Sequence, residues 1–247
     1  YTSTSSGTGM VNCFNANVEG LVFENCLFKP SSFAPTYDGA ISNIVFGHSF
    51  TINRCDLSGA GDIVGVYSGQ GLEVPARNVS ILGSYLHDMT YYSPNPNHSD
   101  NQSHNDIVQV HGGVDNFLMR GCTAEAYIDP TVGAAMVEPY QVDGQHGGGN
   151  MYYPSLAWMA VFMVTPANLT AGVRDFYIDQ NWIGGGRAAI NWARDDGINV
   201  QITNNRWTGG SSAAGDLTIL MRPAQVATIT GNYFEDTLEP WDVRRNG

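Results

Sequence analysis

A short sequence pattern recurs seven times along the chain, and this repeat restricts the fold more than any other feature. Each copy has alternating apolar residues, then a small or amide residue at its sixth position, then another apolar residue two positions on. A unit this short cannot bury its own apolar face, so successive copies are expected to stack on one another. The copies are LVFENCLF (21–28), FTINRCDL (50–57), VSILGSYL (79–86), FLMRGCTA (117–124), FYIDQNWI (176–183), VQITNNRW (200–207) and ATITGNYF (227–234).

The sixth positions of these copies measure the length of one repeat. The spacings between them are 29, 29, 38, 59, 24 and 27 residues. We interpret the 38 as one unit with an inserted loop. The 59 is interpreted as two units, with LAWMAVFMV at 156–164 supplying a strand of the second. The spacings therefore predict about eight coils, with loop insertions near 90–105 and 138–155.

A second strand pattern follows the small-residue position in four of the units. Glycine and asparagine lie between the two patterns, where the chain must turn with positive φ, and no helical periodicity accompanies them. The sequence thus predicts an all-β chain, a single parallel β-solenoid domain over residues 1–247. The four second patterns are GDIVGVYS (61–68), NDIVQVHG (105–112), RAAINWAR (187–194) and GDLTILMR (215–222).

Residues in one column of a stacked repeat lie directly above one another. The sixth-position column is expected to be buried at a turn, where each amide can bond the next. Its cysteines are expected to be free apolar side chains. A disulfide between Cys26 and Cys55 is the alternative, although parallel side chains on adjacent strands give it marginal geometry. The column consists of Cys26, Cys55, Ser84, Cys122, Asn181, Asn205 and Asn232.

From about residue 9 to 235, these repeats resemble the right-handed parallel β-helix proteins of the pectate-lyase-like superfamily. That superfamily includes polysaccharide lyases, glycoside hydrolases, phage tailspikes and adhesins, so the resemblance implies a fold without choosing a function. Its pectin hydrolases carry N-x-D, D-D, G-H-G and R-x-K motifs. Here Asp195 and Asp196 form a D-D and GHS at 47–49 half matches the histidine motif, but no R-x-K exists. The only lysine, Lys29, lies at the edge of the first coil, which argues against a lysine-based lyase.

Charge narrows the class of ligand. The net charge of −12 disfavours nucleic acid. It also repels a polyanionic sugar unless Ca²⁺ or local arginines intervene, so a neutral polysaccharide is favoured. No apolar run is long enough for a membrane span. A chain that starts at Tyr1 is interpreted as a mature product or an excised domain, located outside the cell or on a virion surface.

The stretch NHSDNQSHNDIVQVHGG at 97–113 holds the strongest candidates for catalysis. Aligning its strand with the one at 61–68 places Asp62 against Asp106 and Tyr67 against His111. Strand alternation predicts that Val108 and Val110 point inward while Ile107, Gln109 and His111 point outward. Stacked carboxylates about 5 Å apart would titrate separately and could supply an acid and a base. The predicted catalytic residues are Asp62, His104, Asp106 and His111.

A structural role is the alternative for both aspartates. Aspartate before a strand commonly bonds nearby backbone amides, and the same residue recurs at Asp216. No resident cofactor is predicted. Asp88, His98, Asp100 and His104 are the residues that could bind Ca²⁺ through the inserted loop, although their spacing matches no defined metal motif.

The predicted substrate-binding residues are drawn from three parts of the chain. Gln109 and Tyr67 belong to the strands already described, and His146 lies in a glycine-rich loop at 142–153. Trp192 could equally fill the core, and an arginine near carboxylates is often a plain surface ion pair. The remaining candidates are Asn191, Trp192 and Arg194, from the segment 184–197.

Two functions follow from these patterns. The first is a carbohydrate-active enzyme, a glycoside hydrolase or polysaccharide lyase that acts on an extracellular or cell-surface polysaccharide. The second is a non-catalytic glycan-binding or structural module of a phage tailspike, tail fibre or adhesin, for which a homotrimer is one arrangement. An enzyme should gather Asp106, His111 and the 142–153 loop in one place, whereas a rod should scatter them.

Overall fold

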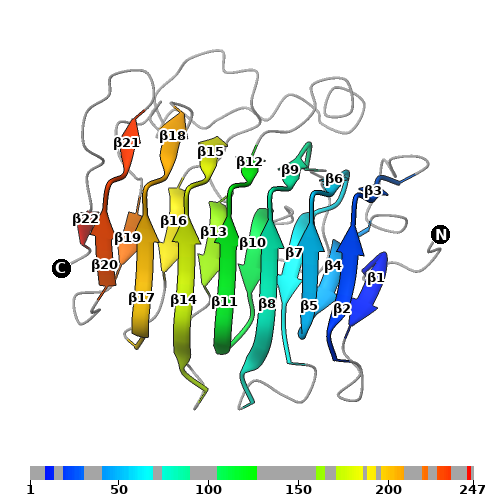
Figure 1. Cartoon of the computed structure of the whole chain (residues 1–247), viewed down its shortest axis with the longest axis horizontal. Helices are drawn as coiled ribbons and strands as arrows, with labels where there is room; N and C mark the ends of the chain where they lie inside the picture. Colours follow the sequence, from blue (N-terminus) through cyan, green and yellow to red (C-terminus); the bar gives the residue numbers. More distant parts are fainter. Residues whose placement is uncertain are drawn as a thin grey trace, which may run out of the picture.

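The structure is a computed structural model. It describes residues 9–13, 19–30, 41–68, 74–89, 105–126, 160–164, 171–185, 188–192, 196–208, 219–221, 227–234 and 244–245. Within these residues every element is a β-strand, and every strand pairing is parallel. The strands form three sheets, which we call A, B and C; in Figure 1 sheet B lies in front, sheet A behind it and sheet C along the top.

Sheet A contains eight described strands in the order in which they occur in the chain. The described parts of all four second strand patterns lie in this sheet. They are the strands β7, β10, β16 and β19, and β13 pairs with both β10 and β16. The strands are β1 (Val11–Cys13), β4 (Asn43–Gly47), β7 (Asp62–Val66), β10 (Asp106–Val110), β13 (Ala160–Val164), β16 (Ala188–Trp192), β19 (Ile219–Met221) and β22 (Arg244–Arg245).

Sheets B and C contain seven described strands each. Sheet B consists of β2 (Leu21–Glu24), β5 (Phe50–Asn53), β8 (Ala76–Leu82), β11 (Val114–Arg120), β14 (Val173–Asp179), β17 (Ile198–Thr203) and β20 (Ala227–Thr230). Sheet C consists of β3 (Leu27–Phe28), β6 (Asp56–Ser58), β9 (Tyr85–His87), β12 (Thr123–Ala126), β15 (Trp182–Gly185), β18 (Arg206–Thr208) and β21 (Tyr233–Phe234).

The chain visits the sheets in the fixed order A, B, C and then returns to A one strand further along. This arrangement confirms the predicted all-β class with stacked parallel strands and is compatible with a β-solenoid. The interpretation of the 59-residue spacing as two units was wrong. Strand β11 pairs directly with β14, and the Cys122 amide donates to the Asn181 Oδ1 at 2.9 Å. The longest interval is therefore one turn of the chain. Its extra length lies between β12 and β14, a stretch that includes only one described strand, β13.

Each passage from sheet B to sheet C is a two-residue turn. The first residue has positive φ, from 50° at Gly83 to 67° at Gly231, a conformation that suits glycine and asparagine. The second residue is the sixth position of the repeat. The first residues of the seven turns are Asn25, Arg54, Gly83, Gly121, Gln180, Asn204 and Gly231.

The sixth-position residues form the predicted column, which we call the turn ladder. The backbone amide of each of the first six members donates to the side chain of the member in the next coil, for example Cys55 to the Ser84 Oγ at 3.0 Å and Asn181 to the Asn205 Oδ1 at 3.0 Å. All four cysteines of the chain are free thiols, so Cys26 and Cys55 are not bridged. The Cys55 Sγ instead accepts a hydrogen bond from the Cys26 amide at 3.4 Å.

Candidate functional site

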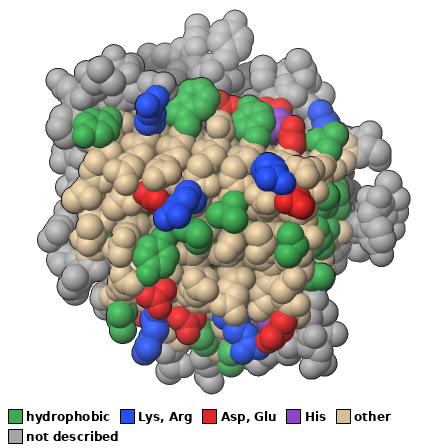
Figure 2. Space-filling model, viewed as in Figure 1, with side chains coloured by type: hydrophobic (Ala, Val, Ile, Leu, Met, Phe, Trp, Pro, Cys, Tyr) green, Lys and Arg blue, Asp and Glu red, His purple; other side chains and the backbone are tan. Residues whose placement is uncertain are grey.

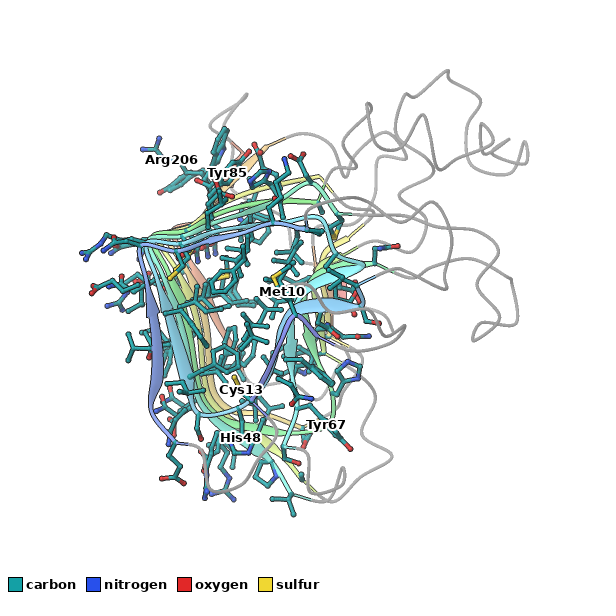
Figure 3. The ribbon with its side chains drawn as sticks, turned by 90° about the vertical axis from the view of Figure 1, so that its right-hand side faces the viewer. Met10, Cys13, His48, Tyr67, Tyr85 and Arg206 are labelled. Carbon is teal, nitrogen blue, oxygen red and sulfur yellow. The ribbon has the colours of Figure 1, made fainter. Side chains whose placement is uncertain are left out.

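The predicted alignment of β7 with β10 is confirmed. Gly65 pairs with Gln109, and the rings of Tyr67 and His111 meet edge-on with their centroids 6.1 Å apart. Tyr67 stands on the outer side of the ribbon, away from the interior that Met10 and Cys13 enter (Figure 3). The structure thus brings five of the predicted site residues together on two neighbouring strands and the residues that directly follow them: Asp62, Tyr67, Asp106, Gln109 and His111.

Asp62 and Asp106 occupy corresponding positions at the entrances of these strands. The Asp106 backbone amide donates to the Asp62 Oδ1 at 2.9 Å, which is the backbone-bonding role expected of a structural aspartate. Burial raises the pKa of Asp62 well above that of an ordinary carboxyl group. The hydrogen bond from the Asp106 amide and the side chain of Asn43 act in the opposite direction and do not cancel the rise. Asp62 therefore holds its proton longer than a surface aspartate, as a general acid requires.

His111 is also shaped by burial. Loss of solvent lowers its pKa to about 4, so the imidazole is neutral at physiological pH. A neutral imidazole has one donor nitrogen and one acceptor nitrogen, and it can accept a proton or a hydrogen bond from a ligand hydroxyl group. Burial thus raises the pKa of Asp62 and lowers the pKa of His111, because it disfavours the charged form of each group.

Two residues of this site escaped the sequence analysis. The Phe46 ring stacks on Tyr67 with centroids 5.8 Å apart and meets the His111 ring edge-on at 5.8 Å. Gly65 makes room for it, because a Cβ atom there would lie 2.2 Å from the Phe46 Cδ2. Asn43 pairs with Asp62 in the strand register. The signal was present in NIVFG at 43–47, which aligns with DIVGV at 62–66, but the first strand lacks the acidic residue that drew attention to the others.

Strict alternation failed at Ile107. The outward orientation expected for this residue is wrong, since both Ile107 and Val108 are fully buried members of the core. The same holds for Ile63 and Val64 one strand earlier. Consecutive buried residues at the start of the strand mean that the phase of the aspartates just before them cannot be deduced by counting back from Val110 in steps of two.

The other predicted site residues fall elsewhere. Trp192 is only 1% exposed and meets the Phe176 ring edge-on at 5.2 Å, so it fills the core, which was the alternative considered for it. The backbone of Asn191 continues the Gln109 column through Met163, but its side chain is outside the described part of the structure. His104, His146 and Arg194 also lie outside the described residues, as do almost all of the two predicted insertions. His48 of the GHS segment is buried and lies 2.8 Å from the Ser49 Oγ.

Sheet C carries a second polar cluster, which sequence reasoning missed. The two ring nitrogens of His87 lie 2.8 Å from the Asp88 Oδ2 and 2.9 Å from the Asp56 Oδ1. The Tyr85 ring stacks on His87 with centroids 3.8 Å apart, and its hydroxyl group donates to Glu125. Burial and the Glu125 carboxylate raise the pKa of Tyr85 above its ordinary value. These groups satisfy one another, so the cluster holds its own side chains in place.

Within the described residues, no group of three or more histidine, cysteine or acidic side chains is arranged to hold a metal ion. Of the residues considered for Ca²⁺, Asp88 is described and is bonded to His87, whereas His98, Asp100 and His104 lie outside the described residues. The search for helices capable of crossing a membrane found none in the part of the chain that the structure describes. Comparison of the chain with protein-family models, curated proteins and solved structures gives no match.

Proposed function

We propose that the chain is a carbohydrate-active enzyme, a glycoside hydrolase or polysaccharide lyase that binds a polysaccharide on the outer face of sheet A. We further propose that the three sheets form a single right-handed parallel β-helix domain of about eight coils, of the pectate-lyase-like superfamily. It also places the protein outside the cell or on a virion surface.

One observation carries the proposal: an aspartate with a raised pKa and a histidine with a lowered pKa lie on adjacent strands, beside an aromatic cluster. Groups whose titration is displaced by burial gather at catalytic sites more often than elsewhere. In this scheme Asp62 donates a proton to the leaving glycosidic oxygen. Asp106, its carboxylate neighbour, is the base that takes a proton from water as the water oxygen bonds to the anomeric carbon and the glycosidic bond breaks.

The neighbouring side chains suit a sugar ligand. Tyr67 and Phe46 offer ring faces and a hydroxyl group, and Gln109 is half-buried with an amide that both donates and accepts hydrogen bonds. Neutral His111 adds an acceptor for a sugar hydroxyl group or for the proton that a lyase removes. His104, His146, Arg194 and Asn191 remain predicted contributors to the same site.

A second function rests on a specific observation. Asp62 is already engaged by the Asp106 backbone amide, as a purely structural aspartate would be. The corresponding candidate is a non-catalytic glycan-binding or structural module of a tailspike, tail fibre or adhesin, in which the same face contacts a glycan without cutting it. A homotrimer belongs to this second candidate.

The test is cleavage of a panel of neutral and acidic polysaccharides, followed by reducing-end release and by the ultraviolet absorbance of unsaturated products. Asp62→Asn keeps an oxygen for the Asp106 amide while removing the acid, and it should lower the rate by about 10²–10⁴-fold. Asp106→Asn and His111→Ala should also be impaired. Asp115→Asn, an exposed position on sheet B, is the matched control and should cleave normally. Equal rates in Asp62→Asn, Asp106→Asn and wild type would contradict the mechanism, and binding without any cleavage would favour the second function.

A further inference from the structure

The outer face of sheet C carries a column of aromatic side chains that the core does not require. Three large aromatic residues of this column are exposed: Tyr85 by 37%, Trp182 by 40% and Tyr233 by 47%. The alternate positions of the same strands, such as Leu86, Ile183 and Trp207, are buried in the core. We call the outward column the sheet C strip. From β9 to β21 it consists of Tyr85, Thr123, Trp182, Arg206 and Tyr233.

The strip is regular. Its aromatic residues occupy every second strand, since Thr123 separates Tyr85 from Trp182 and Arg206 separates Trp182 from Tyr233. Neighbouring strands lie about 4.8 Å apart, so successive aromatic residues are separated by about 10 Å along the axis. Figure 2 shows hydrophobic side chains alternating with charged ones along the upper edge of the molecule, over the short strands of sheet C. Figure 3 shows Tyr85 and Arg206 projecting from this edge.

The strip is also held in place. His87 covers one side of the Tyr85 ring, and Glu125 accepts its hydroxyl hydrogen, so this ring is fixed before any ligand arrives. Gly184 takes the next position of β15, opposite Glu125 of β12, and adds no side chain beside Trp182. The ordered Tyr85 ring loses little conformational freedom on binding.

We propose that the sheet C strip binds an extended, neutral, β-linked polysaccharide along the axis of the molecule. The C–H faces of pyranose rings pack on aromatic rings, and a straight β-linked chain repeats every two sugars. That two-sugar advance matches the double strand spacing of the strip. Thr123, Glu125 and Arg206 can exchange hydrogen bonds with sugar hydroxyl groups between the rings. The net charge of −12 opposes a polyanionic chain and leaves a neutral one as the complementary ligand.

This surface is separate from the candidate site on sheet A, and it shares with the proposed function only the class of ligand. Its role is to hold the polymer while chemistry takes place on another face. Binding at the strip can therefore be tested separately from cleavage.

The experiment measures depletion of the full chain from solution by amorphous cellulose, chitin and insoluble β-mannan, as binding isotherms. Trp182→Ala should weaken binding to at least one of these polymers by at least about tenfold, because a central exposed tryptophan carries much of the affinity of such surfaces. Trp182→Phe should retain most of the binding. Tyr177→Ala removes an aromatic residue from sheet B and should bind as wild type does, which controls for a general loss of aromatic surface.

Asp62→Asn separates this proposal from the proposed function, since it should impair cleavage while the loss of binding caused by Trp182→Ala stays the same with or without it. If no polymer is cut but binding depends on Trp182, the strip is supported and the enzyme is not. If polymers are cut while Trp182→Ala binds as tightly as wild type, the strip is overturned. It is also overturned if wild type binds none of the three polymers, or if Trp182→Ala only abolishes self-association seen by sedimentation.

Discussion

The turn ladder and the outer face of sheet A are both built from columns of stacked residues, but the residue type is kept along the ladder and changes from coil to coil on sheet A. In the ladder, every member is a small or amide residue, and each coil repeats the same backbone-to-side-chain hydrogen bond. On the face of sheet A, one column of the strand register runs from Asn12 through Phe46 and Gly65 to Gln109. A column that repeats its chemistry serves the stacking of coils, whereas a column that changes at each coil is free to serve a ligand.

The ladder itself changes character along its length. In the first coils sulfur accepts two of the three amide hydrogens, at 3.4 Å for Cys26 to Cys55 and 3.5 Å for Ser84 to Cys122, and the Ser84 Oγ accepts the third at 3.0 Å. In the later coils an asparagine oxygen accepts it at about 3.0 Å, and the amide nitrogen adds a further bond, as from Asn205 to the Ile178 oxygen. The asparagine end is therefore bonded more strongly than the cysteine end.

The largest effect is expected from Asn205→Leu at the asparagine end. Asn205 is fully buried, and its replacement leaves the amide of Asn181 without its acceptor and removes the side-chain donor to the Ile178 oxygen. We expect a loss of about 3–5 kcal/mol in the free energy of unfolding, measured by urea denaturation. Asn204→Gly, at the preceding turn position where other coils have glycine, should cost about 1 kcal/mol or less. A similar loss in both variants would show that the ladder has no special role.

An intermediate effect is expected from His111→Gln on the face of sheet A. Burial lowers the pKa of His111 to about 4, so between pH 6.5 and 4 the unfolded chain binds a proton that the folded chain does not. The free energy of unfolding of wild type should therefore decrease as the pH is lowered from 6.5 to 4, by about 2–3 kcal/mol from His111 alone. The variant lacks this contribution, so the difference in unfolding free energy between the two should shrink or reverse as the pH is lowered.

Asp62 gives the opposite sign, because its folded pKa is raised and its stabilising contribution is lost as pH rises through that value. It is present in both chains, so it cancels when His111→Gln is compared with wild type at each pH. Parallel pH profiles for the two proteins would contradict the burial assigned to His111.

The smallest effect is expected from Cys55→Ser at the cysteine end of the ladder. Serine already occupies the next ladder position, where the Ser84 Oγ accepts the Cys55 amide and donates to the Leu82 oxygen at 2.8 Å. We expect a change within about 1 kcal/mol in the free energy of unfolding. Cys55→Leu is the matched contrast, since added volume in the stack should cost about 1–3 kcal/mol. A loss from Cys55→Ser as large as that from Asn205→Leu would mean that the two ends of the ladder are equally demanding.

Part of the candidate site was accessible from the sequence. The alignment of Gly65 with Gln109 and of Tyr67 with His111 follows from two similar strand patterns, and the structure confirms it. Phe46 was missed because its ring occupies the room left by the missing side chain of Gly65 on the next strand, which neither strand shows by itself. The sheet C strip was missed for a similar reason. Tyr85, Trp182 and Tyr233 each look like an isolated aromatic residue until the strand register aligns them.

The sequence by itself determined the parallel stacking, the positions of the turns and the identity of the ladder. A repeated pattern can satisfy its apolar faces and its turn amides only by placing equivalent residues in columns. Only the tertiary structure decided that the 59-residue interval is a single turn of the chain, that Ile107 and Trp192 are buried, and which side chains meet across coils. Periodicity fixes which residues share a column, but burial and pKa depend on the neighbours that other coils bring to each position.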